Sequence, residues 1–155
     1  MTVQQLLVRV RQRLHDMQKV KYADADLIYA LNNAIYNMST VATQQRNPQF
    51  VKTMVVKPDK ITILPKDFIS FVGQYPVVLD EDETKKHVAV TFFDEDYPIP
   101  MELRYYAVRP FVTKMEDDIP FRERAQIIAL IEATVQDVVG GQNPQQVQQE
   151  GGEQQ

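Results

Sequence analysis

The sequence predicts an α+β fold, in which helices from both ends of the chain form one bundle, a β-rich region is inserted between them, and an extended tail follows. Three segments, residues 2–19, 23–46 and 120–139, repeat apolar residues at intervals of three and four, as a helix with one buried face does. Residues 50–109 instead alternate apolar and polar positions and contain frequent proline, which is typical of short strands. Residues 141–155 are rich in glutamine and glycine, and such a composition cannot bury enough apolar surface to order itself.

The first helix is predicted over residues 2–19 from an apolar stripe made of Val3, Leu6, Leu7, Val10, Leu14 and Met17. A series of basic residues lies mostly outside this stripe: Arg9, Arg11, Arg13, His15, Lys19 and Lys21. A run of charges of this kind is usually a solvated helix face, and this is the interpretation we favour. A partner surface or a nucleic-acid surface are the alternatives.

The second helix, residues 23–46, is the element around which we expect the chain to be organised. Its apolar residues form one continuous stripe on one side of a helix: Leu27, Ile28, Leu31, Ala34, Ile35, Met38, Val41 and Ala42. Asp24 is the expected N-cap, because its carboxylate can accept from the free amides of the first turn, and Asn47-Pro48 ends the helix. Asn32 is a poor helix former, so we expect its side chain to make a hydrogen bond.

A second stripe runs beside the first on this helix and consists of Tyr29, Asn33, Tyr36 and Thr40. Tyrosine is enriched in contacts between subunits, so the stripe is a candidate interface in a ring of identical chains. The boundary of the bundle core is an equally good interpretation.

Six short strands are expected in the inserted region, over residues 50–56, 60–64, 67–72, 75–79, 88–93 and 101–108, and Gly73 can supply the backbone of a turn. Two connections are acidic and contain Asp80, Glu81, Asp82, Glu83, Asp94, Glu95 and Asp96. The sixth and twelfth positions counted from Asp80 hold Lys85 and Thr91, which an EF-hand calcium loop does not tolerate. We therefore predict solvated loops and no metal site. An acidic edge that faces a neighbouring subunit or the DNA in a channel lumen is the alternative.

The closing helix is predicted over residues 120–139, because Asp117-Asp118-Ile119-Pro120 is a helix-start signal. Its apolar face is wide and contains Phe121, Ala125, Ile127, Ile128, Leu130, Ile131, Val135, Val138 and Val139. A face of this width predicts a helix that is buried between the other two. Gly140-Gly141 ends it, and we expect the segment that follows to become ordered only on a partner.

The composition of the 155 residues narrows the functional classes. Cysteine is absent, which excludes disulfides, thiolate metal sites and a cysteine nucleophile. The formal net charge of -4 argues against a protein whose main task is to neutralise phosphates over a broad surface. No apolar run is long enough for a signal peptide or a membrane span, so we expect a soluble protein of the cytoplasm with no membrane partner. No catalytic motif is present, and we expect no enzymatic activity, no metal and no cofactor.

Three short runs resemble the head-to-tail adaptor proteins of tailed bacteriophages. Tyr22-Ala23-Asp24-Ala25-Asp26-Leu27-Ile28, followed by Leu31-Asn32, is similar to the early helix of that family. Ile61-Thr62-Ile63-Leu64-Pro65-Lys66-Asp67-Phe68-Ile69 is similar to its recurrent Leu-Pro-x-Asp-Phe-aliphatic element. Leu103-Arg104-Tyr105-Tyr106-Ala107 and Asp118-Ile119-Pro120-Phe121 are similar to its late strand and the entry to its closing helix. The order and spacing agree over most of residues 1–140, which would then be one adaptor-like domain.

The resemblance implies a structural virion protein of the head–tail junction, assembled in the cytoplasm of the bacterial host. Members form a homo-oligomeric ring, commonly of twelve subunits, beneath the capsid portal. The ring extends the channel through which genomic DNA passes and meets the next neck or tail protein. Their C-terminal segments commonly dock on the portal, which by position implies portal-binding residues Gln142, Asn143, Pro144, Gln145, Gln146, Val147, Gln148 and Gln149.

Three alternatives remain at this stage. Another ring of the neck or tail, such as a stopper or a tail-tube protein, fits the same residues. A small DNA-binding regulator would use the basic first helix, although Asp24 and Asp26 would repel DNA from the start of the second. A metal-dependent hydrolase would need the acidic loops to converge on an ion.

Overall fold

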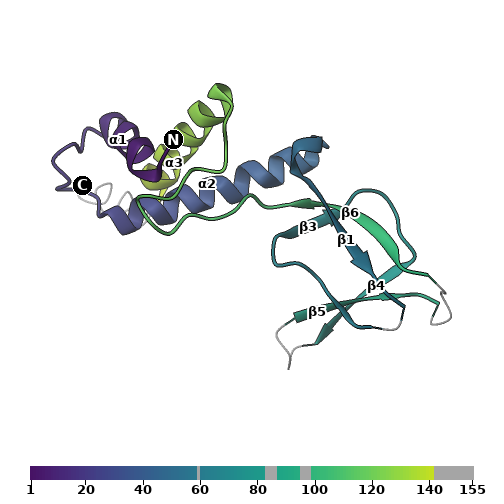
Figure 1. Cartoon of the computed structure of the whole chain (residues 1–155). Helices are drawn as coiled ribbons and strands as arrows, with labels where there is room; N and C mark the ends of the chain where they lie inside the picture. The colour runs from purple at the N-terminus through teal and green to yellow at the C-terminus, as the bar shows by residue number, and fades with distance from the viewer. Residues whose placement is uncertain (59, 83–86, 95–98, 142–155) are drawn as a thin grey trace, which may run out of the picture. The chain divides into compact units, whose positions relative to one another are not determined.

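The computed structural model describes residues 1–58, 60–82, 87–94 and 99–141. Within these residues the chain forms three α-helices and two small antiparallel sheets, so the predicted α+β class is confirmed (Figure 1). The elements in chain order are α1 (Val3–Arg13), α2 (Asp24–Gln44), the 3-10 turn η1 (Pro48–Phe50), β1 (Val51–Val56), β2 (Thr62–Ile63), β3 (Phe68–Phe71), β4 (Val77–Asp82), β5 (His87–Phe92), β6 (Met101–Ala107) and α3 (Arg124–Gly140). The tail predicted over residues 141–155 lies outside the described residues except for Gly141.

The chain divides into two compact units. The terminal unit comprises Met1–Met38 and Pro110–Gln155, and the inserted unit comprises Ser39–Arg109. The division falls inside α2, so the first fifteen residues of that helix belong to the terminal unit and the last six to the inserted unit.

The core of the terminal unit is built from the apolar stripes of its helices. Its fully buried side chains include Val3, Leu6 and Val10 of α1, Leu27, Leu31 and Ile35 of α2, and Leu130 of α3. The two ends of the unit are also joined by backbone hydrogen bonds, from Val3 N–H to the carbonyl of Asp117 at 2.9 Å and from Ile119 N–H to that of Met1 at 3.0 Å. The predicted periodicity therefore identifies the centre of each helix correctly.

The ends of α1 and α3 differ from the prediction. Helix α1 ends at Arg13 instead of residue 19, because His15 adopts a left-handed backbone with a φ of 54°. Helix α3 begins at Arg124 instead of residue 120. The expected start signal serves a turn instead, since the Asp117 carboxylate accepts from the amides of Thr113 at 2.8 Å and Lys114 at 2.9 Å.

Five residues assigned to buried stripes are exposed. Met17 is 53% exposed because it lies beyond the end of α1, and Val41, Ile128 and Val139 are 48%, 42% and 53% exposed. Ala125 is exposed as well. The face of α3 that is buried is thus narrower than its apolar residues suggested. Thr134 lies on the buried face and is fully covered, with its hydroxyl donating to the carbonyl of Leu130 at 2.7 Å.

The inserted unit contains two three-stranded antiparallel sheets, with strand orders β1-β6-β3 and β2-β5-β4. Each of the six predicted strands is present. In the first sheet Met54 lies opposite Leu103, and in the second Leu79 lies opposite Val90. Residues of both sheets share one hydrophobic cluster, which contains Met54, Val56, Val90, Leu103, Tyr105 and Ala107. The alternation of buried and exposed positions along β1 and β6 is the signal that predicted these strands.

Strand β4 corrects one prediction about the acidic residues. Asp80, Glu81 and Asp82 belong to the strand and pair with Ala89, Val88 and His87 of β5, whereas we expected them in a loop. Backbone pairing does not depend on the side chain, and an edge strand keeps its charges in water. Asp94 follows β5 in a bend, while Glu83, Glu95 and Asp96 lie outside the described residues.

Gly73 supplies the turn backbone as predicted, with a φ of +94° after β3. A Cβ built there would meet no atom within 4 Å, so an alanine would be disfavoured by the backbone conformation alone. We expect Gly73→Ala to lower the free energy of unfolding by about 1–2 kcal/mol. Urea titration measures this, and Gly140→Ala, at a helical position with open space, is the control, expected to be neutral or slightly stabilising.

Candidate functional site

A buried charge cluster joins the end of α1 to the start of α2. The Arg11 side chain is 4% exposed, and its two terminal nitrogens contact Asp16 Oδ2 at 2.7 Å and Asp24 Oδ1 at 2.6 Å. The nitrogen that contacts Asp24 also donates to the carbonyl of Tyr22 at 3.0 Å. Asp16, 5% exposed, accepts from the backbone amides of Val20, Lys21 and Tyr22 at 2.9–3.1 Å. The Arg11 guanidinium and the Asp16 carboxylate therefore hold the connection between α1 and α2 through hydrogen bonds.

This cluster corrects two predictions. Arg11 does not belong to a solvated face, because it continues the buried stripe at the four-residue spacing of Val3 and Leu7. Asp24 is the first residue of α2 and not its N-cap, since its carboxylate pairs with Arg11 and, at 3.3 Å, with Lys19. The spacing of Arg11 from Leu7 was the signal in the sequence that could have identified the buried arginine.

The carboxylates of this cluster make the free energy of unfolding depend on pH. Hydrogen bonds, first from the amide of Lys21, hold the pKa of Asp16 below its ordinary value of 3.8 against the opposing effect of burial. The hydrogen bond from Arg11 lowers the pKa of Asp24 in the same way. A depressed folded-state pKa stabilises the protein above the unfolded-state pKa, and this stabilisation is lost as the pH falls through the folded-state value.

We therefore expect the free energy of unfolding to fall when the pH is lowered from 5 to 3. Urea titrations at intervals of half a pH unit measure the slope. Asp16→Asn is expected to show a shallower slope, because one of the depressed carboxyls is removed. An equally steep slope in that variant would contradict the assignment.

The residues of the second stripe of α2 differ in burial. Tyr29 and Tyr36 are 70% and 52% exposed. The side-chain amide of Asn33 instead donates to Asp137 of α3 at 3.2 Å, which places it at the boundary of the core. Thr40 is half-buried. Asn32, next to the stripe, donates to the carbonyl of Val112 at 2.8 Å and accepts from its amide at 2.9 Å, so the predicted hydrogen bond is confirmed.

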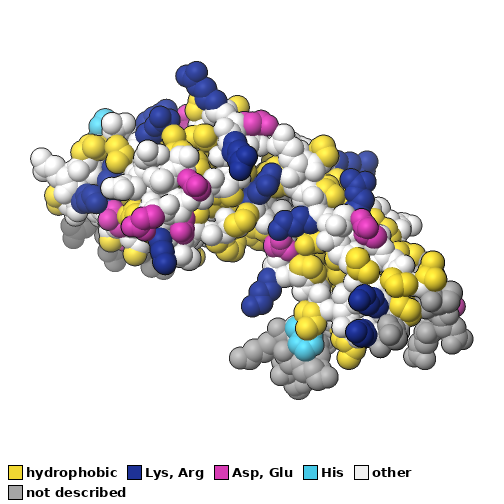
Figure 2. Space-filling model, in the orientation of Figure 1, with side chains coloured by type: hydrophobic (Ala, Val, Ile, Leu, Met, Phe, Trp, Pro, Cys, Tyr) yellow, Lys and Arg dark blue, Asp and Glu magenta, His cyan; other side chains and the backbone are white. Residues whose placement is uncertain are grey.

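The sheet β2-β5-β4 presents an apolar face to solvent. Ile63 lies opposite Ala89 and Val78 lies opposite Thr91, on the face of β5 that points away from the buried Val90. Ile63 is 57% exposed and Val78 39% exposed. Ile61, just before β2, and Phe93, just after β5, are 71% and 72% exposed. We call these four residues the apolar sheet face; hydrophobic side chains are visible on the surface of this unit in Figure 2.

Asp67, in the run that resembles the adaptor family, has a structural role in the inserted unit. Its carboxylate pairs with Lys52 at 2.5 Å and accepts from the hydroxyl of Tyr105 at 3.2 Å, and its carbonyl accepts from Val108 N–H at 2.7 Å. Burial, and then the charge of Asp67, raise the pKa of the Tyr105 hydroxyl. The turn between β2 and β3 is thereby attached to β1 and β6.

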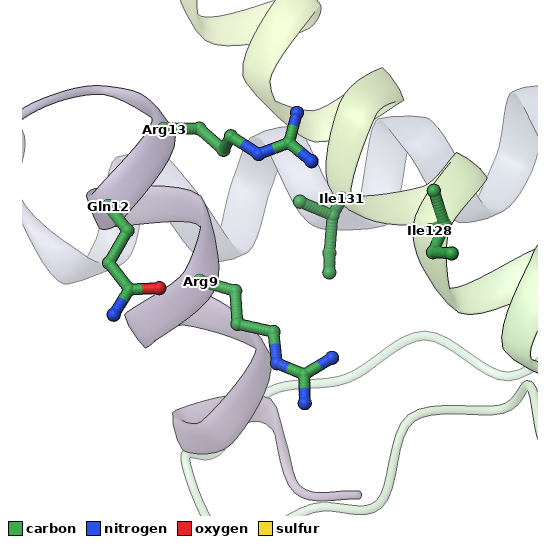
Figure 3. Close-up of a pocket in the computed structure, with 5 residues that line it drawn as sticks. All are labelled: Arg9, Gln12, Arg13, Ile128 and Ile131. Carbon is green, nitrogen blue, oxygen red and sulfur yellow. The ribbon is translucent and has the colours of Figure 1, made fainter.

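A hollow of about 240 Å³ lies between α1 and α3. It is lined by Arg9, Gln12 and Arg13 of α1 and by Ile128 and Ile131 of α3. Figure 3 shows the two arginine side chains reaching from α1 toward α3 on either side of Ile131. Guanidinium groups donate hydrogen bonds to carboxylates and phosphates, so these residues can bind an anionic group.

The predicted portal-binding residues cannot be placed in this structure. All eight of the predicted portal-binding residues, Gln142 to Gln149, lie outside the described residues. Among the described residues, no group of three or more histidine, aspartate or glutamate side chains could hold a metal ion. No helix in the same part of the chain has both the length and the apolar character needed to cross a membrane.

No protein-family model matches the chain, and the search of curated proteins also gives no match.

Proposed function

We propose that this chain is a structural virion protein of the head–tail junction of a tailed bacteriophage. In this role identical copies, commonly twelve, form a ring that joins the capsid portal to the tail and extends the DNA channel. The protein catalyses no reaction and carries no cofactor. Helices from the two ends of the chain form the bundle of the ring, and the tail, residues 142–149 above all, docks on the portal.

The observation that carries this proposal is the amount of apolar and aromatic surface left exposed on two different elements. Tyr29 and Tyr36 project from α2, and the apolar sheet face lies in the inserted unit. A contiguous exposed apolar patch often marks a site where a partner binds. Two such surfaces suit a subunit that contacts a neighbouring copy and a further protein.

The resemblance to the adaptor family gives independent support. In this chain Tyr22–Asn32 leads into α2, Ile61–Ile69 spans β2 and β3, and Leu103–Ala107 lies on β6. Asp118–Phe121 precedes the start of α3 at Arg124. One residue of these runs, Asp67, fixes a turn through its contacts with Lys52 and Tyr105, so the Leu-Pro-x-Asp-Phe run has a physical reason in this chain.

Reconstitution on the portal ring from the same genome tests the proposal. The full chain is mixed with the portal and imaged by negative stain, beside a variant in which residues 142–149 are replaced by alternating glycine and serine. We expect a second ring stacked on the portal with the full chain only. If neither protein binds while both remain folded, the portal is not the partner, and a different neck or tail ring is tested next.

The contribution of Tyr29 to the ring can be measured separately. Tyr29→Ala is expected to weaken ring assembly by about 30-fold, because a central tyrosine in an interface typically contributes 2 kcal/mol or more. The free energy of unfolding should change by less than about 0.5 kcal/mol, since the side chain is 70% exposed. Asn37→Ala, an exposed position of α2 outside the stripe, is the control and should assemble normally. Normal assembly of Tyr29→Ala would remove this stripe from the interface.

A further inference from the structure

The hollow between α1 and α3 combines a cationic rim with an apolar floor. Arg9 has no hydrogen-bond or ion-pair partner among the described residues. Arg13 contacts Glu132 at 3.4 Å, with both side chains more than half exposed, and such a pair is easily exchanged. Ile131 is 5% exposed at the floor, whereas Ile128 is 42% exposed at the edge. A peptide with one aliphatic residue and nearby carboxylates could place the aliphatic side chain on the isoleucines and the carboxylates on the arginines.

The chain itself contains a segment with this chemistry. Residues 142–155 include Glu150 and Glu153 and have no lysine, arginine or histidine. Their one aliphatic side chain, besides the ring of Pro144, is Val147. The segment therefore carries negative charge only, three and six residues after a valine.

The segment also starts within reach of the hollow. Ile128 lies about 18 Å along α3 from Gly140, because each helical residue rises about 1.5 Å. The six residues from Gly141 to Val147 can span about 20 Å when they run back along the helix. Glu150 and Glu153 then extend past Ile128 to α1, where the arginines are.

We propose that the hollow binds the chain's own segment 142–155, with Val147 against Ile128 and Ile131 and with Glu150 and Glu153 against Arg9 and Arg13. The link through α3 keeps the segment at a high effective concentration, so a contact that is weak between separate molecules is populated within one chain. The contact stands apart from the proposed function. Only one consequence rests on that function: the segment is held on its own subunit until the portal competes for it.

Paramagnetic relaxation in the full chain tests the contact without any portal. Because the chain has no cysteine, Gln155→Cys provides a single attachment point for a nitroxide and leaves Val147, Glu150 and Glu153 unchanged. We expect the amide signals of Arg9, Arg13 and Ile128 to lose at least half of their intensity. The loss should decrease in 0.5 M NaCl, where charges are strongly screened.

Charge reversal provides the matched controls. Glu150→Lys with Glu153→Lys, or Arg9→Glu with Arg13→Glu, should abolish the signal loss, and the combination of all four substitutions should restore it. Undiminished signals in the labelled wild-type background would overturn the proposal, and so would a loss that survives either reversal. In a second sample, nitroxide-labelled chains without isotope are mixed with unlabelled isotope-enriched chains. If the signal loss occurs only in this mixture, the segment binds a neighbouring copy, and the proposal is overturned.

Discussion

Arg11→Met is expected to lower the free energy of unfolding by about 3–5 kcal/mol, because it removes one partner from a buried ion pair and leaves the other. The Arg11 guanidinium is the cation that contacts both Asp16 and Asp24, at 2.7 and 2.6 Å. Asp16 would retain its three amide donors but lose the charge that neutralises it in a site where it is 5% exposed. Methionine fills the same volume, so the loss measures the charge and its hydrogen bonds more than a cavity.

Urea unfolding, followed through amide signals of the terminal unit, measures this effect. Arg9→Met is the matched control, because Arg9 is an exposed arginine two residues away on α1, and it should change stability by less than about 0.5 kcal/mol. Arg11→Lys keeps the charge but cannot reach two carboxylates and a carbonyl with one planar group, so it should fall between the two. Equal stability of Arg11→Met and Arg9→Met would show that the cluster contributes nothing to folding.

The pattern of apolar residues was sufficient where burial repeats with a fixed period. Alternation gave β1, where Met54 and Val56 are buried two positions apart, and the start of β6, where Leu103 and Tyr105 are. The end of β6 departs from alternation, since Tyr105, Tyr106 and Ala107 are all buried. Leu27, Leu31 and Ile35 gave the centre of α2 by the same argument at four-residue spacing. The hydrogen bond of Asn32 could be expected from its poor helix propensity, although its partner, Val112, could not.

The pattern of apolar residues did not predict the contacts that charged side chains make. Arg11 looked like part of a basic face, because the sequence does not show that Asp16 and Asp24 turn back toward it. Asp117 looked like a helix start, but its carboxylate accepts from residues that precede it.

The second large effect is expected at Asn32, whose side-chain amide makes hydrogen bonds to both backbone groups of Val112. It accepts from the amide of Val112 at 2.9 Å and donates to the carbonyl at 2.8 Å, and Val112 is 3% exposed. Leucine has a similarly branched side chain but cannot make either hydrogen bond. Asn32→Leu therefore leaves two buried backbone groups unpaired, and we expect a loss of about 2–4 kcal/mol in the free energy of unfolding.

Hydrogen exchange can identify the contact that is lost. The amide of Val112 should exchange much faster in Asn32→Leu than in the wild type, because its acceptor is gone. The amide of Val3 keeps its bond to Asp117 and should exchange faster only by the factor that the lower free energy of unfolding predicts. Asn37→Ala, an exposed asparagine on the same helix, should be neutral or slightly stabilising, since alanine is the better helix former. If Asn32→Leu were as stable as the wild type, apolar packing would hold the segment before α3 against α2, and the paired hydrogen bonds would be incidental to it.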